Sequence, residues 1–289
     1  MNKWILGARP RTLPAAIAPV ITSAALAYHL NTSVNFLNIF LALLVGLALQ
    51  IGVNYSNDYS DGIRGTDENR VGPTRLVASG LASAASVKRA AQITYLFGAI
   101  VGAYLSIRVN TWLLVIGLIS ILAAWFYTGG KNPYGYKGLG DISVFIFFGL
   151  VATLGTYYVA TKTLSIWALL LSIQMGLLSC AILAVNNLRD LPKDKEVGKL
   201  TLAVRLGDRR ARNYLISLLI MALGVQIIFI KLTYLAIVPV LLLPYGLRIS
   251  RQIRLGLQGS QLIPTLGQIA KIQALAALWI TLSLILGRA

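Results

Sequence analysis

The chain has 289 residues, of which 57% are hydrophobic and only 12% are charged, and its mean hydropathy is +0.73. Soluble domains carry about 25% charged residues, so the composition excludes a soluble α/β enzyme, a disordered chain and a disulfide scaffold. The net charge of +17 would suggest a nucleic-acid partner for a soluble protein. In a membrane protein, Lys and Arg collect in cytoplasmic loops instead. We therefore predict a lipid bilayer as partner and no nucleic acid.

Apolar stretches recur along the whole sequence, each close to the roughly twenty residues that a helix needs to cross the hydrocarbon core. They predict an all-α fold of nine transmembrane helices around a central cavity, in a single domain over residues 1–289. The predicted spans are 13–30, 36–56, 90–107, 111–127, 141–160, 165–188, 212–230, 233–248 and 267–287.

The basic residues predict the orientation of these spans. With nine spans, 21 of the 26 Lys and Arg residues fall on the side of the N-terminus, and four fall on the opposite side. The remaining one, Lys271, begins the last span. Because cytoplasmic loops collect basic residues, we predict a cytoplasmic N-terminus and a multi-pass protein of the cell membrane. A site built on the basic side would then face the cytoplasm.

The acidic residues are few and clustered. Of nine Asp and Glu residues, four lie within 58–68 and three within 190–196. Carboxylates at the end of a membrane helix are costly unless they are paired or bind metal, and such groups are functional by default. Pairing with neighbouring basic residues of the loops is the alternative explanation. The double cluster favours a functional site.

The first acidic segment extends an apolar helix. Four of its polar residues are spaced i, i+3, i+4 and i+7, which places them on one helical face: Asn54, Asn57, Asp58 and Asp61. Asp67 can join them if the chain turns back after Gly62 and Gly65.

The second acidic segment repeats this pattern on another helix. Asn186, Asn187, Asp190 and Asp194 share a face if the helix continues. Pro192 is an obstacle, because its ring would clash with the carbonyl group of Leu188 and kink the helix.

Together the two segments supply only oxygen ligands. Without a nearby His or Cys, the set argues against zinc, copper and iron and favours Mg²⁺, which commonly bridges to substrate phosphates. Two facing clusters would hold two Mg²⁺ ions with one diphosphate between them. Neighbouring basic side chains suit phosphate oxygens: Arg64, Arg70, Arg75, Arg189, Lys193 and Lys199.

With these motifs the chain resembles the UbiA-type superfamily of intramembrane aromatic prenyltransferases, and most closely its bacterial 1,4-dihydroxy-2-naphthoate branch. Nearly the whole chain shares the likeness. The segments that carry it are Arg9–Pro14, Asn54–Asp67, Tyr127–Gly140, Phe147–Leu150, Gly155–Tyr158, Asn186–Asp190 with Asp194, Gly198–Lys199 and Thr201–Gly207.

One position departs from the wider pattern of the superfamily, which has Asn followed by Asp four and eight residues later. Asn57 and Asp61 match the first two places, but the third falls on Gly65, and Asp67 comes two residues late. Asn57, Asp58 and Asp61 are therefore stronger metal-site candidates than Asp67.

The resemblance implies an Mg²⁺-dependent transfer of a polyprenyl group from its diphosphate to 1,4-dihydroxy-2-naphthoate, with loss of CO₂ and diphosphate. Catalysis is expected from Asp58, Asp61, Asp190, Asp194 and Tyr127. The expected metal ligands are Asn54, Asn57, Asp58, Asp61, Asp67, Asn187, Asp190 and Asp194. The expected substrate-binding residues are Arg11, Arg64, Arg70, Arg75, Lys131, Tyr134, Tyr136, Lys137, Arg189, Lys193 and Lys199.

Within the loop 127–140, the tyrosines are expected to line the pocket and to face an allylic cation with their rings, although tyrosines are also common anchors at the membrane interface. Arg11 is expected to complete the site that binds the anionic substrate. An equal alternative is that it only anchors the N-terminus on the cytoplasmic side. We expect Asp141 to orient the acceptor hydroxyl or to pair with Lys137. Asp208 lies among Arg205, Arg209 and Arg210, and we expect it to pair locally.

Two rival functions remain open. A sister prenyltransferase would use another aromatic acceptor, such as 4-hydroxybenzoate, homogentisate or a chlorin. A transporter or Mg²⁺ channel would place acids at mid-membrane along a pathway, whereas these acids lie at helix ends on one side. No inverted repeat is visible either.

Overall fold

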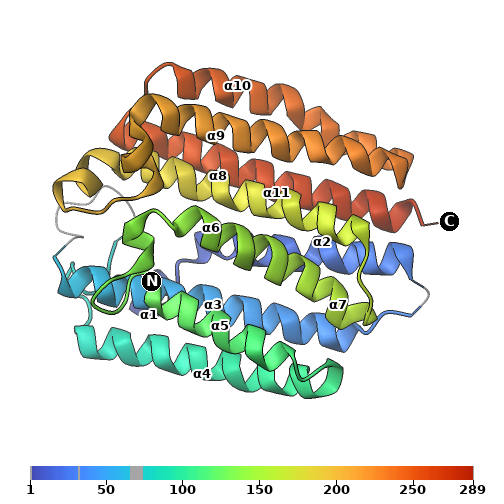
Figure 1. The fold of residues 1–289 in the computed structure, drawn as a ribbon, viewed down its shortest axis with the longest axis horizontal. Helices are drawn as coiled ribbons and strands as arrows, with labels where there is room; N and C mark the ends of the chain where they lie inside the picture. The colour runs from blue at the N-terminus through green and yellow to red at the C-terminus, as the bar shows by residue number, and fades with distance from the viewer. Residues whose placement is uncertain (1, 32, 66–73, 289) are drawn as a thin grey trace.

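The structure is a computed structural model that describes residues 2–31, 33–65 and 74–288. Throughout these ranges the regular structure is helical and contains no strand. The long helices run nearly parallel in one bundle, with α1 toward its left end and the end of α11 at its right end (Figure 1). This confirms the all-α prediction.

The N-terminal half of the bundle contains five α-helices. They are α1 (Lys3–Ala8), α2 (Pro14–Leu30), α3 (Phe36–Ile63), α4 (Ala84–Val109) and α5 (Leu113–Phe126). Side-chain caps start three of them: Asn2 accepts a hydrogen bond from the Trp4 amide, Asn35 from the Asn38 amide and Ser83 from the Ser86 amide. Such caps satisfy amide groups that the first turn of a helix leaves without a partner.

The C-terminal half begins with one long helical segment that changes its winding. It comprises α6 (Gly140–Val144), the π-helix η3 (Phe145–Leu154) and α7 (Gly155–Thr161). The later helices are α8 (Ile166–Glu196), α9 (Leu202–Ile228), the 3₁₀ segment η5 (Tyr234–Leu242), α10 (Leu243–Arg254) and α11 (Ile263–Leu286). A short 3₁₀ turn, η2 (Tyr134–Lys137), lies in the loop before α6.

Seven helices in the described ranges are long and apolar enough to cross a membrane. An eighth is possible if the segments Lys3–Thr12 and Pro14–Leu30, which are bent by 50°, form one span. Helix α5 has 14 residues and falls short of the usual length. All nine predicted spans are helical, but the count of nine remains a prediction.

Pro192 lies inside α8, which continues past it to Glu196. Asp194 therefore stays on the same helix as Asn186 and Asn187. Leu200 and Lys199 follow directly in the loop to α9, and the Lys199 amide donates to the carbonyl oxygen of Asp194 at 2.8 Å. That bond ties the loop back onto the end of α8.

Close helix packing builds the core around α8. Helix α8 packs on α9 and on η3, while α2 packs on α11 and α3 packs on α4. Gly149 of η3 meets Gly176 of α8 so closely that a Cβ atom at Gly149 would lie 2.9 Å from the Cα atom of Gly176. Two glycines thus allow the π-helix to approach α8.

A cavity of about 2010 Å³ lies inside the bundle. Its wall comes from α2, α3, α4, α5, η3, α8 and α11. Polar residues gather at one end, near the turn Arg9–Thr12 and the loop residue Arg75. The opposite end reaches Asn110 and Leu164, so the cavity extends along the helices.

Candidate active site

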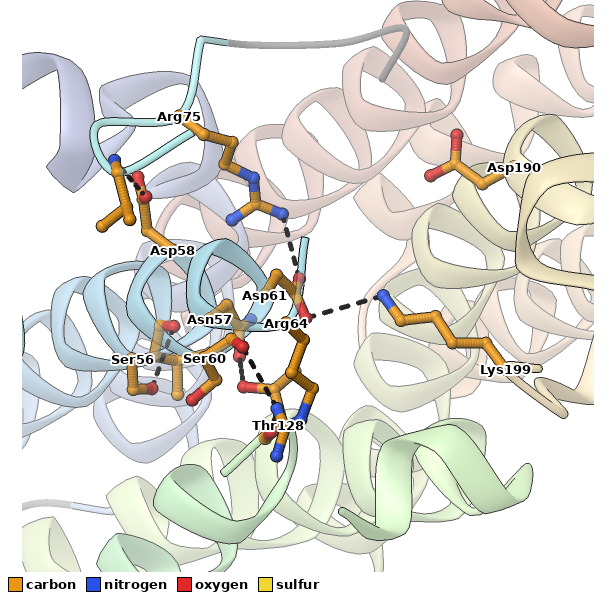
Figure 2. A network of polar contacts seen from close by, with 12 residues as sticks. Ser56, Asn57, Asp58, Ser60, Asp61, Arg64, Arg75, Thr128, Asp190 and Lys199 are labelled. Carbon is orange, nitrogen blue, oxygen red and sulfur yellow. Dashed lines mark hydrogen bonds and ion pairs between the residues drawn. The ribbon is translucent and has the colours of Figure 1, made fainter. Parts of the chain in front are cut away.

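The polar end of the cavity brings both acidic segments together. Asn57 and Asp61 from α3 line the same cavity as four residues of α8, which are Asn186, Asn187, Asp190 and Asp194. In Figure 2, Asp61 on α3 and Asp190 on α8 lie on facing sides of the site, and Lys199 extends between them. The structure thus brings residues of both acidic segments to one end of the cavity.

Asp61 contacts the side chains of Tyr136, Lys199 and Arg75. It is 3% exposed, and its Oδ1 accepts a hydrogen bond from the Tyr136 hydroxyl at 2.6 Å. Lys199 Nζ lies 3.6 Å from Oδ1, and an Arg75 guanidinium nitrogen lies 3.6 Å from Oδ2. The two cations come from different loops, so Asp61 joins the α3–α4 loop to the α8–α9 loop (Figure 2).

Tyr136 connects three parts of the site. Besides its bond to Asp61, its carbonyl oxygen accepts the Leu200 amide at 2.9 Å. Lys199 Nζ lies 4.4 Å from the centre of its ring, and Arg64 Cζ lies 5.6 Å from it. The ring therefore already faces protein cations, whereas the sequence suggested that it would face a substrate cation.

The second acidic segment carries its own counter-ion. Arg189 is 5% exposed and donates two hydrogen bonds to the Asp190 carboxylate, each at 2.7 Å. Such paired contacts are charge-assisted and hold both side chains in place. Arg189, Asp190 and Asp194 all line the cavity.

Asp58 differs from its expected place in the metal site. Its carboxylate is fully buried and accepts hydrogen bonds from the backbone amides of Leu76 at 2.8 Å and Val77 at 3.0 Å. Asp58 does not belong to the cavity wall, and Figure 2 shows it turned away from Asp190. The predicted common face therefore does not aim every side chain at the cavity.

Asn54 also has a structural partner. Its amide nitrogen donates to the Ala8 carbonyl oxygen at 2.9 Å and to the Thr12 hydroxyl at 3.0 Å. These bonds hold the turn between α1 and α2, where Arg9 adopts a left-handed backbone with φ of 52°. Such a conformation is uncommon for a residue other than glycine, and Asn54 stabilises it.

Arg64 binds the protein rather than reaching into the cavity. Its guanidinium donates to the carbonyl oxygens of Thr128 and Gly130. The Thr128 hydroxyl in turn donates to Asn57 Oδ1 at 2.7 Å. Together these bonds fasten the loop 127–138 onto the end of α3.

The remaining predicted side chains of this loop separate into two groups. Tyr127 and Tyr134 line the cavity and pack edge to face with ring centres 5.5 Å apart. Burial raises the pKa of the Tyr134 phenol, and its hydroxyl donates to the Ala123 carbonyl oxygen at 2.9 Å. Lys131 and Lys137 are exposed and outside the cavity wall.

Four predicted site residues remain to be placed. Arg11 lines the cavity, and Lys193 does not. Asp67 and Arg70 lie outside the described residues.

The two other acids have local partners. Asp141 accepts a hydrogen bond from the Tyr214 hydroxyl at 3.1 Å, so Lys137 is not the partner that holds it. Asp208 pairs at 2.7 Å with Arg212, one helical turn later. Local pairing of Asp208 is confirmed, with a partner further along the helix than expected.

The donor set fits a hard cation. Asn57, Asp61, Asn187, Asp190 and Asp194 line the cavity, and their side chains offer oxygen ligands, which suit Mg²⁺. Within the part of the chain that the structure describes, no three His, Cys, Asp or Glu side chains form a metal-binding group. The acids instead stand on two facing helices, as a ligand that bridges them would require.

Two residues of the site were missed from the sequence. Thr128 orients Asn57, but its place in a glycine-rich loop gave no sign of that partner. Lys271 was assigned only to the start of a span, yet it lines the cavity within α11. A charged residue inside an apolar helix was the available signal.

The fold and the site define a class: an integral membrane protein whose helices enclose an apolar cavity with facing carboxylates and cations at one end. The chain belongs to the UbiA prenyltransferase family, whose model matches residues 16–261.

Relatives of known name support this assignment. The chain is 47% identical over 264 residues to the 1,4-dihydroxy-2-naphthoate octaprenyltransferase of Mycobacterium tuberculosis, a match that covers 91% of this chain and 90% of the relative. It is 38% identical over 298 residues to the enzyme of the same name from Haemophilus influenzae. This match covers 99% of this chain and 97% of the relative.

Solved structures share the fold. The structure of a UbiA homolog from Archaeoglobus fulgidus bound to DMAPP and Mg²⁺ superposes with a TM-score of 0.70 at 15% identity, covering 98% of this chain and 99% of that one. A digeranylgeranylglyceryl phosphate synthase gives a TM-score of 0.67 at 16% identity, with 98% of each chain covered.

Proposed function

We propose that this protein transfers a polyprenyl group from polyprenyl diphosphate to 1,4-dihydroxy-2-naphthoate. The C1–O bond of the prenyl diphosphate breaks, a carbon–carbon bond to the aromatic ring forms, and the ring carboxylate leaves as CO₂. The other product is diphosphate, and the prenylated ring is demethylmenaquinol. The names of the relatives that share 38–47% identity support this acceptor over its alternatives.

One observation carries the proposal: carboxylates on α3 and α8 face one apolar cavity, with basic side chains from two loops between them. A cavity of about 2010 Å³ exceeds the roughly 300–1,000 Å³ of typical ligand pockets. It has room for a long prenyl chain beside a bicyclic acceptor.

The charged residues would stabilise the leaving group. Asp61, Asp190 and Asp194 would hold Mg²⁺ against the diphosphate, with Asn57 and Asn187 as further ligands. When bound, Mg²⁺ neutralises charge that develops on the departing oxygen. Acids and amides stand on both α3 and α8, which supports a pair of ions over a single ion.

Arg75 and Lys199 would share the charge of the diphosphate. Both already lie at Asp61, so an incoming phosphate would find the cations in place. The apolar wall would exclude water, which would otherwise react with the allylic cation.

We also propose nine spans in a single domain, a cytoplasmic N-terminus and a place in the cell membrane. The distribution of 26 Lys and Arg residues supports this topology. Helix α5 would cross with its 14 residues plus neighbouring residues. The site would then open toward the cytoplasm.

The test is reconstitution from purified components. Protein in detergent receives Mg²⁺, polyprenyl diphosphate and 1,4-dihydroxy-2-naphthoate, and both CO₂ and the prenylated product are measured. We expect the two products in equal amounts and no need for a membrane gradient. Turnover of 4-hydroxybenzoate or homogentisate in preference to the naphthoate would overturn the proposed acceptor. Activity that requires a membrane gradient would overturn the assignment as an enzyme.

A further inference from the structure

We infer that Asp58 is a positioning residue that fixes Arg75 for the diphosphate, and that it is not a metal ligand. The inference rests on the proposed function, because it assigns Arg75 to the leaving group of that reaction. It separates two acids that lie three residues apart on one helix, Asp58 and Asp61.

The first observation is the hydrogen bonding of Asp58. Each carboxylate oxygen accepts one backbone amide, from Leu76 at 2.8 Å and from Val77 at 3.0 Å. Hydrogen bonds to an ionised acceptor are about twice as strong as neutral ones. A fully buried carboxylate with its oxygens bonded in this way is already compensated by protein.

The second observation is how closely Leu76 and Val77 pack against neighbouring helices. A Cβ atom at Gly62 would lie 2.6 Å from Val77 Cβ, and one at Gly7 would lie 2.6 Å from Leu76 Cδ1. Leu76 is fully buried. Gly7 and Gly62 therefore let the loop pack directly on α1 and α3, beside Asp58.

The third observation is the turn that follows. The Ser79 amide donates to the Arg75 carbonyl oxygen at 3.0 Å, and the Gly80 amide donates to that of Val77 at 3.0 Å. The Ala82 amide donates to the Leu76 carbonyl oxygen at 3.1 Å. The backbone from Arg75 to Ala82 is thus held by hydrogen bonds within this turn.

The consequence concerns Arg75, which precedes the two residues that Asp58 holds. Its side chain is 7% exposed, lines the cavity and lies 3.6 Å from Asp61. A flexible arginine loses side-chain entropy when it binds an anion, whereas a fixed one has lost it already. Asp58 would therefore improve diphosphate binding without touching the diphosphate.

A double-mutant cycle tests this coupling. The variants are Asp58→Asn, Arg75→Gln and the pair, and the readouts are the inhibition constant of inorganic diphosphate with Mg²⁺, the KM for polyprenyl diphosphate, and kcat. We expect Asp58→Asn to weaken diphosphate binding about tenfold with kcat nearly retained. Once Arg75 is removed, Asp58→Asn should add less than about twofold. Additive losses would overturn the inference.

The Mg²⁺ concentration for half-maximal activity separates positioning from ligation. It should be unchanged in Asp58→Asn and strongly raised in Asp61→Asn. Equal shifts in both variants would make Asp58 a metal ligand and overturn the inference. Asp208→Asn, far from this loop in sequence, serves as the matched acidic control.

Gly62→Ala moves the loop without altering any carboxylate. Its methyl group would meet Val77, while alanine suits a helix better than glycine. We expect the same rise in the inhibition constant of diphosphate. This variant carries the test if Asp58→Asn fails to fold, and unchanged diphosphate binding in it would overturn the inference. Wild-type protein that binds Mg²⁺-diphosphate but forms no prenylated naphthoate would overturn the proposed function alone.

Discussion

The two acidic segments look alike in sequence but have different tasks in the structure. On α8, Asn186, Asn187, Asp190 and Asp194 all line the cavity. On α3, Asn57 and Asp61 line it together with Asn54, but Asp58 does not.

The difference follows from what surrounds each helix end. Helix α3 ends beside the turn after α1, the loop before α4 and the loop after α5, all of which need hydrogen-bond partners. Asn54, Asp58 and Asn57 supply them. Helix α8 is followed by a short loop that its own backbone holds at Asp194. A shared helical face therefore did not mean a shared role.

The largest effect should come from Asp61→Asn. Removing this charge leaves Arg75 and Lys199 without their common partner and weakens metal binding. We expect kcat to fall on the order of a thousandfold, as for the loss of a key electrostatic group. The measurement is product formation in detergent over a range of Mg²⁺ concentrations. Activity within tenfold of wild type would remove Asp61 from the centre of the site.

Asp190→Asn should come next, with a loss on the order of a hundredfold in kcat. Asp190 lines the cavity, but two hydrogen bonds from the adjacent Arg189 already neutralise part of its charge. The same assay applies, with the melting temperature as a second readout, because buried Arg189 loses its partner. A fall in melting temperature with normal kcat would mean that the α8 segment is structural as well.

A pair of asparagine variants compares the segments directly. Asn54→Ala should lower the free energy of unfolding by about 1–3 kcal/mol, since the Ala8 carbonyl oxygen and the Thr12 hydroxyl each lose a buried partner. Its Mg²⁺ requirement should be unchanged. Asn187→Ala should raise the Mg²⁺ requirement with little loss of stability. Melting temperature and Mg²⁺ titration measure both, and the reverse pattern would contradict the comparison.

Tyr136→Phe should have a smaller effect, a fall of about tenfold in kcat. The change removes the 2.6 Å hydrogen bond to Asp61 but keeps the ring that Lys199 and Arg64 face. Loss of one bond to a charged group costs about 1.5–3 kcal/mol, and the two cations compensate in part. A loss as large as that of Asp61→Asn would instead give the hydroxyl a direct part in the reaction.

Asp208→Asn should have the smallest effect and serves as the control for loss of an acid outside the cavity. The Asp208 side chain is 48% exposed, and Arg212 keeps bonds to the Ile253 and Leu257 carbonyl oxygens. Solvent screens the half-exposed Asp208 carboxylate, so its pair with buried Arg212 contributes at most about 1 kcal/mol. Steady-state kinetics and melting temperature should match wild type, and a clear loss of activity would extend the site to α9.

The helical architecture was predictable because hydrocarbon permits few ways to satisfy the backbone. All nine predicted spans are helical, including the shorter α5. Asp61, Asp190 and Asp194 were predictable for a related reason, since acids at apolar helix ends require a partner. The sequence left the extension of α8 past Pro192 open, because proline disfavours a helix interior without excluding it.

The sequence by itself determined the class of the protein: apolar stretches defined the helices, and two clusters of acids marked the helix ends that meet at the polar end of the cavity. Only the tertiary structure decided which polar side chains reach the cavity. Asp58 and Asp61 stand on neighbouring parts of one helix, and no local rule tells them apart. The α3–α4 loop packs against Gly62 and takes both oxygens of Asp58 for its amides, while Asp61 remains for Arg75, Lys199 and Tyr136.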